Sequence, residues 1–207
     1  MKSIDDIKAL ITSELGEDKY IIIYNGKIIS NDYSDEEVKI SLSAEMDLLY
    51  NKEISEYERI NDEKSLYSIS ICLLKSMTLK LVNLGDKEKY IHKILSTKTK
   101  VKAQICDIYL SFETKTNIKN DFLIEDSSRI EYLSFMQGNN DDLTTIFNAY
   151  CYGDSKLTVK SLYMLKDVFR HFNTVVFLEE NASVDMFNVI INNSNLSQNY
   201  EYDVIHK

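Results

Sequence analysis

The sequence predicts an α/β protein made of two small units, each combining a mixed sheet with helices. Segments with apolar residues at helical spacing alternate with segments that alternate apolar and polar residues. The five glycines of this proline-free chain fall between such segments. In the second half, expected strands and helices alternate closely, as they do in parallel sheets covered by helices. A chain of 207 residues accommodates one large domain or two small ones.

The first expected unit covers residues 1–115. A helix is expected from Ser3, a suitable N-cap, to Leu15, with Gly16 as its stop. A hairpin follows, because Asn25-Gly26 is the dipeptide typical of a type I′ turn between two β-rich runs. The remaining expected elements are a long helix over about 34–60, strands over 66–71, 77–82 and 90–95, and a helix over 100–112.

The second expected unit covers residues 116–191. The polar, unpatterned stretch 113–120 is interpreted as the boundary between the two units. Beyond it we expect strands over 122–125, 130–133, 157–162 and 174–178, and helices over 138–150, 163–172 and 183–191. Residues 192–207 are rich in Asn and Ser and are expected to form a loosely ordered tail.

The charge and the residue counts exclude several functions. The chain carries 24 basic and 33 acidic side chains, a net charge of -9, so we expect no nucleic-acid partner. Glycine is too sparse for a phosphate-binding loop, and we expect no cofactor. We see no export signal and no apolar run of the roughly 20 residues that a membrane span requires, so we expect a cytoplasmic protein without a membrane partner. Abundant Ile, Asn, Lys and Tyr are typical of an AT-rich genome.

The cysteines and histidines show no pattern typical of a disulfide framework, a zinc site or a catalytic triad. Cys72, Cys106 and Cys151 lie far apart among apolar neighbours, which predicts buried, unreactive thiols. Cys151 or Ser161 could be paired with His171 as a nucleophile and its base, but no spacing in the sequence brings them together.

Three acidic runs are candidates for binding a divalent metal or for acid–base chemistry. They are Asp35-Glu36-Glu37, Asp141-Asp142 and Glu179-Glu180. The simpler interpretation is charges at the start of helices and polar loops. We therefore assign no catalytic, cofactor-binding or metal-binding residue from the sequence.

Two stretches resemble known families. The hairpin text Tyr-Ile-Ile-Ile-Tyr-Asn-Gly-Lys-Ile-Ile at 20–29 and the glycine turn Leu-Lys-Leu-Val-Asn-Leu-Gly-Asp at 79–86 resemble roadblock/longin-like domains over about residues 1–113. That resemblance implies a dimeric scaffold with no diagnostic catalytic motif. Residues 121–191, with Leu-Ile-Glu-Asp-Ser-Ser-Arg-Ile-Glu-Tyr-Leu-Ser at 123–134, resemble STAS domains, the fold of anti-sigma-factor antagonists. The switch loop of that family carries an Asp-Ser-Ser-Gly-type run, whereas this chain has Ser-Phe-Met-Gln-Gly at 134–138, so a phosphorylation switch is not implied.

These observations favour a non-enzymatic regulatory or scaffolding protein that binds another protein. Two alternatives are a phage or viral effector that inhibits a host protein, and a small metal-dependent hydrolase or nuclease with its metal at Glu179-Glu180 or Asp141-Asp142. A homodimer is expected because Ile21, Ile22 and Ile23 make both faces of the hairpin apolar, and one of these faces requires a cover. The competing source of that cover is the second half of the same chain.

Overall fold

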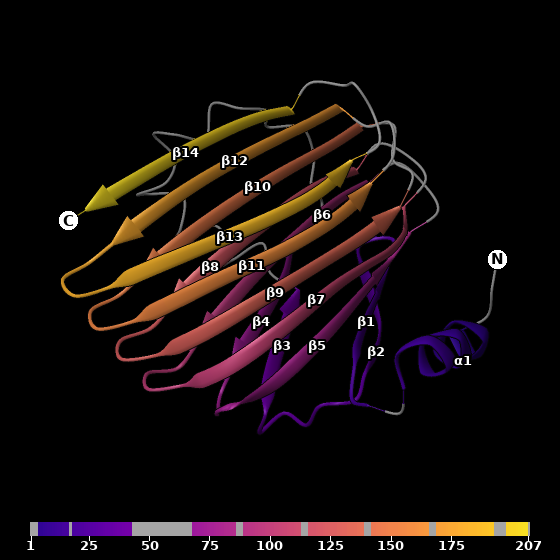
Figure 1. Ribbon diagram of the computed structural model, residues 1–207. Coiled ribbons are helices and arrows are strands. Elements are labelled where there is room, and N and C mark those ends of the chain that lie inside the picture. Colours follow the sequence, from indigo (N-terminus) through magenta and orange to yellow (C-terminus); the bar gives the residue numbers. More distant parts are fainter. Residues whose placement is uncertain are drawn as a thin grey trace.

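The protein is a β-solenoid of two stacked seven-stranded sheets, as the computed structural model in Figure 1 shows. Sheet A has the strand order β13-β11-β9-β7-β5-β1-β2, and sheet B has the order β14-β12-β10-β8-β6-β4-β3. From β4 onward, successive strands along the chain therefore fall in alternate sheets, and one coil consists of one strand from each. The structure describes residues 4–16, 18–42, 68–85, 89–112, 116–138, 142–165, 169–192 and 198–206.

The described elements are one helix, α1 (Ile4–Leu15), and the strands of the two sheets. The strands are β1 (Ile21–Tyr24), β2 (Lys27–Asn31), β3 (Val38–Leu42), β4 (Ser68–Leu73), β5 (Met77–Leu84), β6 (Lys89–Thr97), β7 (Lys102–Phe112), β8 (Thr116–Ile124), β9 (Arg129–Gly138), β10 (Asp142–Cys151), β11 (Lys156–Leu165), β12 (Phe169–Leu178), β13 (Ser183–Asn192) and β14 (Gln198–His206).

A 27-residue period sets the register of the later coils. Lys102 pairs with Arg129, and Lys156 pairs with both Arg129 and Ser183. The turns before these strands repeat with the same period, because the residues with positive φ in them are Lys100, Ser127, Asp154 and Asn181. Each turn bonds to the next, as when the Ser127 amide donates to the Gly153 carbonyl at 3.0 Å. The backbone of a coil inside the stack is therefore hydrogen-bonded to the coils on both sides of it.

The core lies between the two sheets. Inward residues of sheet A, such as Ile105 and Tyr132, meet inward residues of sheet B, such as Phe122 and Phe147, in one apolar cluster. The rings of Phe122 and Tyr132 meet edge to face, with centroids 4.8 Å apart. This cluster draws residues from both halves of the chain, from Ile21 to Leu178.

The α/β fold class predicted from the sequence is wrong, and so are both family resemblances. The helices expected over 100–112, 138–150, 163–172 and 183–191 are strand in their described residues, apart from Lys100 and Val101, which precede β7. Val38–Leu42, expected in the first part of a long helix, is β3. The remainder of that long helix falls outside the described residues. The structure is nearly all sheet with parallel coils, so it fits neither a roadblock/longin-like nor a STAS domain.

The first two elements are confirmed. α1 ends at Leu15 and is followed by Gly16, whose φ of 93° is left-handed and whose amide donates to the Thr12 carbonyl at 3.0 Å. Asn25 and Gly26 both have positive φ, as a type I′ turn requires. The strands expected over 66–71, 77–82 and 90–95 are present in their described residues as β4, β5 and β6, which alternate between the two sheets.

The hairpin is covered on both faces within the chain. Ile21 and Ile23 point into the main core, whereas Ile22 packs under α1 with Ile7 and Ile11. One apolar face of the hairpin is thus covered by α1, and the other face is covered by the solenoid interior. The hairpin therefore gives no reason for a dimer, and the homodimer itself stays a prediction.

Two other segments differ from expectation. Thr116–Asn120, interpreted as a boundary, forms the first half of β8, which pairs with β6 and β10 in the middle of sheet B. Gln198–His206, expected in a loose tail, forms β14 on the edge of the same sheet. Whether residues 1–115 and 116–191 behave as separate units stays a prediction.

Candidate functional site

Exposed apolar side chains gather on one coil. Of the eight large hydrophobic residues that are exposed among the described residues, six lie on β13 and β14, which we call the terminal coil. They are Phe187 (58% exposed), Val189 (55%), Ile191 (50%), Tyr200 (37%), Tyr202 (50%) and Val204 (58%). Clustered apolar exposure of this kind marks interaction sites in soluble proteins.

The terminal coil also presents two sheet edges. β13 pairs only with β11, and β14 pairs only with β12, so the outer edge of each strand carries no partner among the described residues (Figure 1). These edge strands are 10 and 9 residues long. Long, apolar edge strands are templates for pairing with another chain, which most proteins avoid with short or charged edges.

The opposite end of the solenoid is built differently. There the edge strands β2 and β3 have five residues each and run antiparallel to their neighbours β1 and β4. The helix α1 packs beside this end, over Val82 and Leu84 on the outer face of sheet A. One end is therefore closed by reversed short strands and a helix, and the other end presents an apolar edge.

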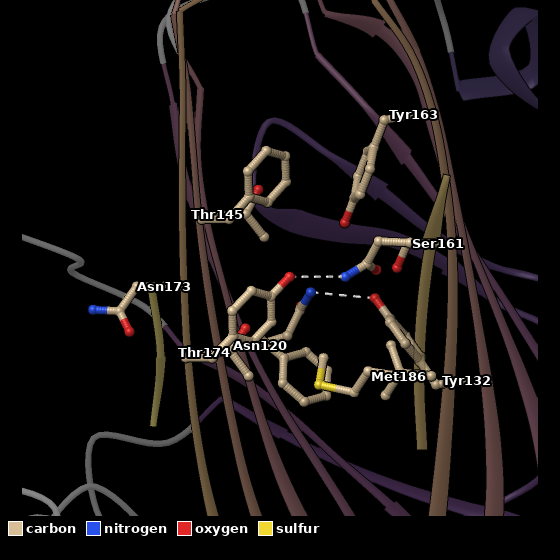
Figure 2. Close-up of a pocket in the computed structure, with 13 residues that line it drawn as sticks. Asn120, Tyr132, Thr145, Ser161, Tyr163, Asn173, Thr174 and Met186 are labelled. Atoms are coloured by element: carbon tan, nitrogen blue, oxygen red, sulfur yellow. Dashed lines mark hydrogen bonds between the residues drawn. The ribbon is translucent and has the colours of Figure 1, made fainter. Parts of the chain in front are cut away.

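A small polar cavity lies beneath the terminal coil, between the sheets (Figure 2). It offers about 20 Å³ to the centres of water molecules, enough for one buried water. Met186, Asn188 and Tyr202 form its wall on the terminal coil, and Asn188 Nδ2 donates to Tyr202 Oη at 3.3 Å. Two buried oxygens lining it, Asn120 Oδ1 and Thr145 Oγ1, have no hydrogen-bond partner among the described residues. The terminal coil therefore rests on a less densely packed part of the interior.

Deeper in the solenoid, the interior holds a buried ion pair. Lys93 on β6 and Asp107 on β7 face each other across the two sheets with no exposed surface. Asp107 also accepts hydrogen bonds from Asn83 Nδ2 (2.7 Å), Tyr109 Oη (2.8 Å) and Tyr132 Oη (2.5 Å). Burial lowers the pKa of Lys93, although the Asp107 charge opposes this, and burial raises the pKa of both tyrosines. This network reaches the cavity beneath the terminal coil at Tyr132, which lines the cavity and donates to Asp107.

The outer face of sheet B carries a Ser–His–Asp arrangement that the sequence did not suggest. Ser68 Oγ lies 2.6 Å from His92 Nδ1, and His92 Nε2 lies 2.6 Å from Asp121 Oδ2. Asn148 Nδ2 donates to the other carboxylate oxygen at 2.8 Å. Ser68, His92 and Asp121 are only 4%, 6% and 2% exposed, so a substrate has no access to the hydroxyl. The arrangement is a satisfied polar network and not a nucleophilic site.

The nucleophile candidates from the sequence do not meet. Cys151 pairs with Leu178, at the far end of β12 from His171, a separation of about 23 Å along the strand. Ser161 lines the interior cavity, whereas His171 lies on the outer face of sheet B, where it contacts Asn199 Nδ2 at 3.2 Å.

The acidic runs are also apart. Glu37 lies in the turn before β3, where Ser34 and Lys19 donate to its carboxylate and hold its pKa at about 2. Asp142 begins β10, while Glu179 follows the last residue of β12, about 30 Å away by the strand register. Asp141 is outside the described residues. Within the described ranges, no group of three His, Cys, Asp or Glu side chains is placed to hold a metal ion.

The three thiols are free in the structure. Cys151 is fully buried, and burial raises its pKa to about 12. Burial also raises the pKa of the half-buried Cys106. The expectation of buried thiols therefore holds for Cys151 and only in part for Cys72 and Cys106.

No known protein family and no curated protein matches this chain. In the part of the chain that the structure describes, no helix is long and apolar enough to cross a membrane. The candidate function therefore depends on the geometry of the terminal coil.

Proposed function

We propose that this protein acts by binding another protein through the terminal coil, as a scaffold or regulator. The observation that carries the proposal is the concentration of six exposed apolar side chains on β13 and β14. Because both strands also present an unpaired edge, a partner can add main-chain hydrogen bonds to the apolar contacts.

The asymmetry of the two ends supports the same function. Repeat proteins stay soluble by closing their ends with polar or irregular elements. Here the reversed strands β2 and β3 and the helix α1 do this at one end, while the terminal coil keeps its apolar edge. An edge of this kind is best explained as a surface that is covered in the assembled state.

The metal-dependent alternative finds no ligand cluster in the described part of the chain. It requires Glu179-Glu180 or Asp141-Asp142 to gather further ligands, and no third acidic, histidine or cysteine side chain among the described residues completes a metal site with Glu179. Asp141 and the side chain of Asp142 lie outside the described part of the structure. Glu179 instead accepts a hydrogen bond from Tyr150 Oη at 3.2 Å.

The test is a differential binding experiment with three variants of the full chain. Val189→Asp and Val204→Asp place a charge on each strand of the terminal coil, and Leu10→Asp makes the same kind of change on exposed α1. We expect the wild type and Leu10→Asp to retain a partner protein, which can be a second copy of the chain, and we expect Val189→Asp and Val204→Asp to lose it. The purified partner should then bind the wild type and Leu10→Asp at least about tenfold more tightly than it binds Val189→Asp and Val204→Asp, since a buried unpaired charge costs over 1.4 kcal/mol. Equal binding by all four proteins would refute the proposal.

A further inference from the structure

We infer that the partner of the terminal coil is a second copy of this chain, joined tail to tail about a two-fold axis. The inference rests on the proposed function and names its partner. It follows from three properties of β13 and β14: their direction relative to the opposite end, the self-complementary order of their side chains, and the area of the coil.

The two ends of the solenoid do not continue each other. Along the later coils every strand pairs parallel to the next, but β2 and β3 run antiparallel to β1 and β4. A head-to-tail stack would set β13 and β14 against these five-residue reversed strands and would bury only about half of each edge. A two-fold axis instead sets β13 antiparallel to β13 of the second copy over nearly its full length, which gives a closed dimer.

The side chains of β13 select one register. In a two-fold antiparallel pair, outward residues must face outward residues, so the axis passes through a residue and not between two. With the axis at Asn188, Phe187 faces Val189 of the second copy, and the same contact occurs twice. In this register Ile191 faces Asp185 of the second copy. With the axis at Phe187, Val189 would face Asp185 instead, and with the axis at Val189, the inward Asn188 would face Ile190. The axis at Asn188 is favoured because it alone of the three gives an apolar pair on both faces of the strand, Phe187 with Val189 outward and Met186 with Ile190 inward.

The inward side of β13 agrees with this register. Met186 then faces Ile190 of the second copy, again twice, and both residues already pack against the core clusters of their own chain. The pairing extends each apolar cluster across the two-fold axis.

β14 follows the same axis. Because Asn188 Nδ2 bonds to Tyr202 Oη, the axis at Asn188 also passes close to Tyr202. Tyr200 then faces Val204 of the second copy, so exposed apolar residues of this strand also meet each other. Tyr200 is already stacked on Phe172 with centroids 5.0 Å apart, which gives the strand a fixed aromatic surface to present.

A like-charge contact on β14 opposes this arrangement and is therefore diagnostic. On the outer face of β14, Glu201 faces Asp203 of the second copy, and like charges directly opposite each other destabilise a strand pair. Removing this repulsion must strengthen the tail-to-tail dimer, whereas a dimer formed through another surface would not respond.

The area of the terminal coil is adequate. Strands of 9 and 10 residues are about 30 Å long, and two sheets with their outward side chains span about 20 Å, giving roughly 600 Å² per copy. Stable complexes bury about 800 Å² per partner, so the coil supports a dimer of moderate affinity.

The test is the mass and affinity of the full chain in solution. Light scattering at micromolar concentration should give twice the monomer mass of 24.1 kDa for the wild type and for Leu10→Asp, and 24.1 kDa for Val189→Asp. Glu201→Lys should tighten the dimer about tenfold by converting two repulsive pairs into attractive ones. Glu36→Lys, the same change in an exposed turn near the closed end, should leave the dissociation constant unchanged.

A second measurement reports the register without depending on affinity. Asn188→Cys places a thiol on the axis, within reach of its copy, and should give a disulfide-linked dimer on mild oxidation. Lys156→Cys on the neighbouring strand should not. A wild-type mass of 24.1 kDa, a dimer that persists in Val189→Asp, or a Glu201→Lys dimer that is not tighter overturns the inference. If the wild type is monomeric while Val189→Asp and Val204→Asp still lose a partner that Leu10→Asp retains, the proposed function stands and only the identity of the partner is wrong.

Discussion

Lys93 and Asp107 form an ion pair across the two sheets, with both side chains fully buried. The two residues differ in their hydrogen-bond partners. Asp107 has three further donors, from Asn83, Tyr109 and Tyr132, whereas the remaining bonds of the Lys93 ammonium go to Tyr109 Oη at 2.6 Å and Asn83 Oδ1 at 3.4 Å. The carboxylate is thus the centre of the network, and the ammonium is one of its donors.

This asymmetry predicts unequal costs of substitution. Lys93→Met leaves Asp107 with three neutral donors, and we expect unfolding free energy to fall by about 3 kcal/mol. Asp107→Leu leaves a buried ammonium and several orphaned donors, and we expect a fall of about 5 kcal/mol. Urea unfolding monitored by circular dichroism measures both.

The matched control is Lys160→Met, which removes a half-exposed lysine paired to Glu131 at 2.5 Å. An exposed pair contributes less than about 1 kcal/mol, so this variant should unfold close to the wild type. Equal losses for Lys93→Met and Lys160→Met would show that the buried pair does not stabilise the fold as argued.

The sequence predicted local elements better than the way they stack. α1 and the hairpin depend on a glycine stop and an Asn-Gly turn, which act within a few residues. β7 was predicted as a helix because it carries apolar residues on both faces, Ile105 and Tyr109 inward and Ile108 outward, and these fall at helical spacing. The buried Asp107 then interrupts the inward alternation that would have indicated a strand.

The 27-residue period was the missed signal. Small polar residues recur in the turns, at Ser127, Asp154 and Asn181, and buried polar residues recur inside, at Asp107, Ser134 and Ser161. A self-comparison at this offset would have indicated a repeat protein before any element was assigned. The sequence shows the apolar residues of β13 and β14, but it predicts a helix and a loose tail there. Only the stacking of the coils places these two strands at the sheet edges.

The repeating turns predict an effect of side-chain shape at Lys100, whose φ is 62°. A β-branched residue is strongly disfavoured in this left-handed conformation, so Lys100→Val should lower the unfolding free energy by about 1–2 kcal/mol. Lys102→Val, two residues on in an exposed strand position, should change it by less than about 0.5 kcal/mol. Urea midpoints compare the two, and a neutral Lys100→Val would contradict the assigned turn.

The buried thiol of Cys151 predicts a dependence of stability on alkaline pH. Its pKa is about 12 in the folded protein against 9.0 for an ordinary thiol, so the folded state keeps a proton that the unfolded state releases. Its contribution is intact below about pH 9 and is lost as the pH rises toward about 12, by about 2 kcal/mol at pH 10.5. Urea unfolding at pH 8 and pH 10.5 should therefore show a smaller decline for Cys151→Ala than for the wild type. An equal decline in both would mean that the thiol is not the cause.

α1 closes one end of the solenoid through one face, and this predicts a sharp contrast between neighbouring residues. Ile11 is 1% exposed and packs with Ile7, Tyr20 and Ile22, whereas Leu10 is 39% exposed. Ile11→Ala should lower the unfolding free energy by about 3 kcal/mol through lost burial and a cavity, while Leu10→Ala should change it by less than about 0.5 kcal/mol. Thermal unfolding of the two variants, with hydrogen exchange at β1, separates their effects, since only Ile11→Ala should speed exchange there. Similar losses for both variants would mean that α1 does not pack on the hairpin through the Ile11 face, and the closed end would need another explanation.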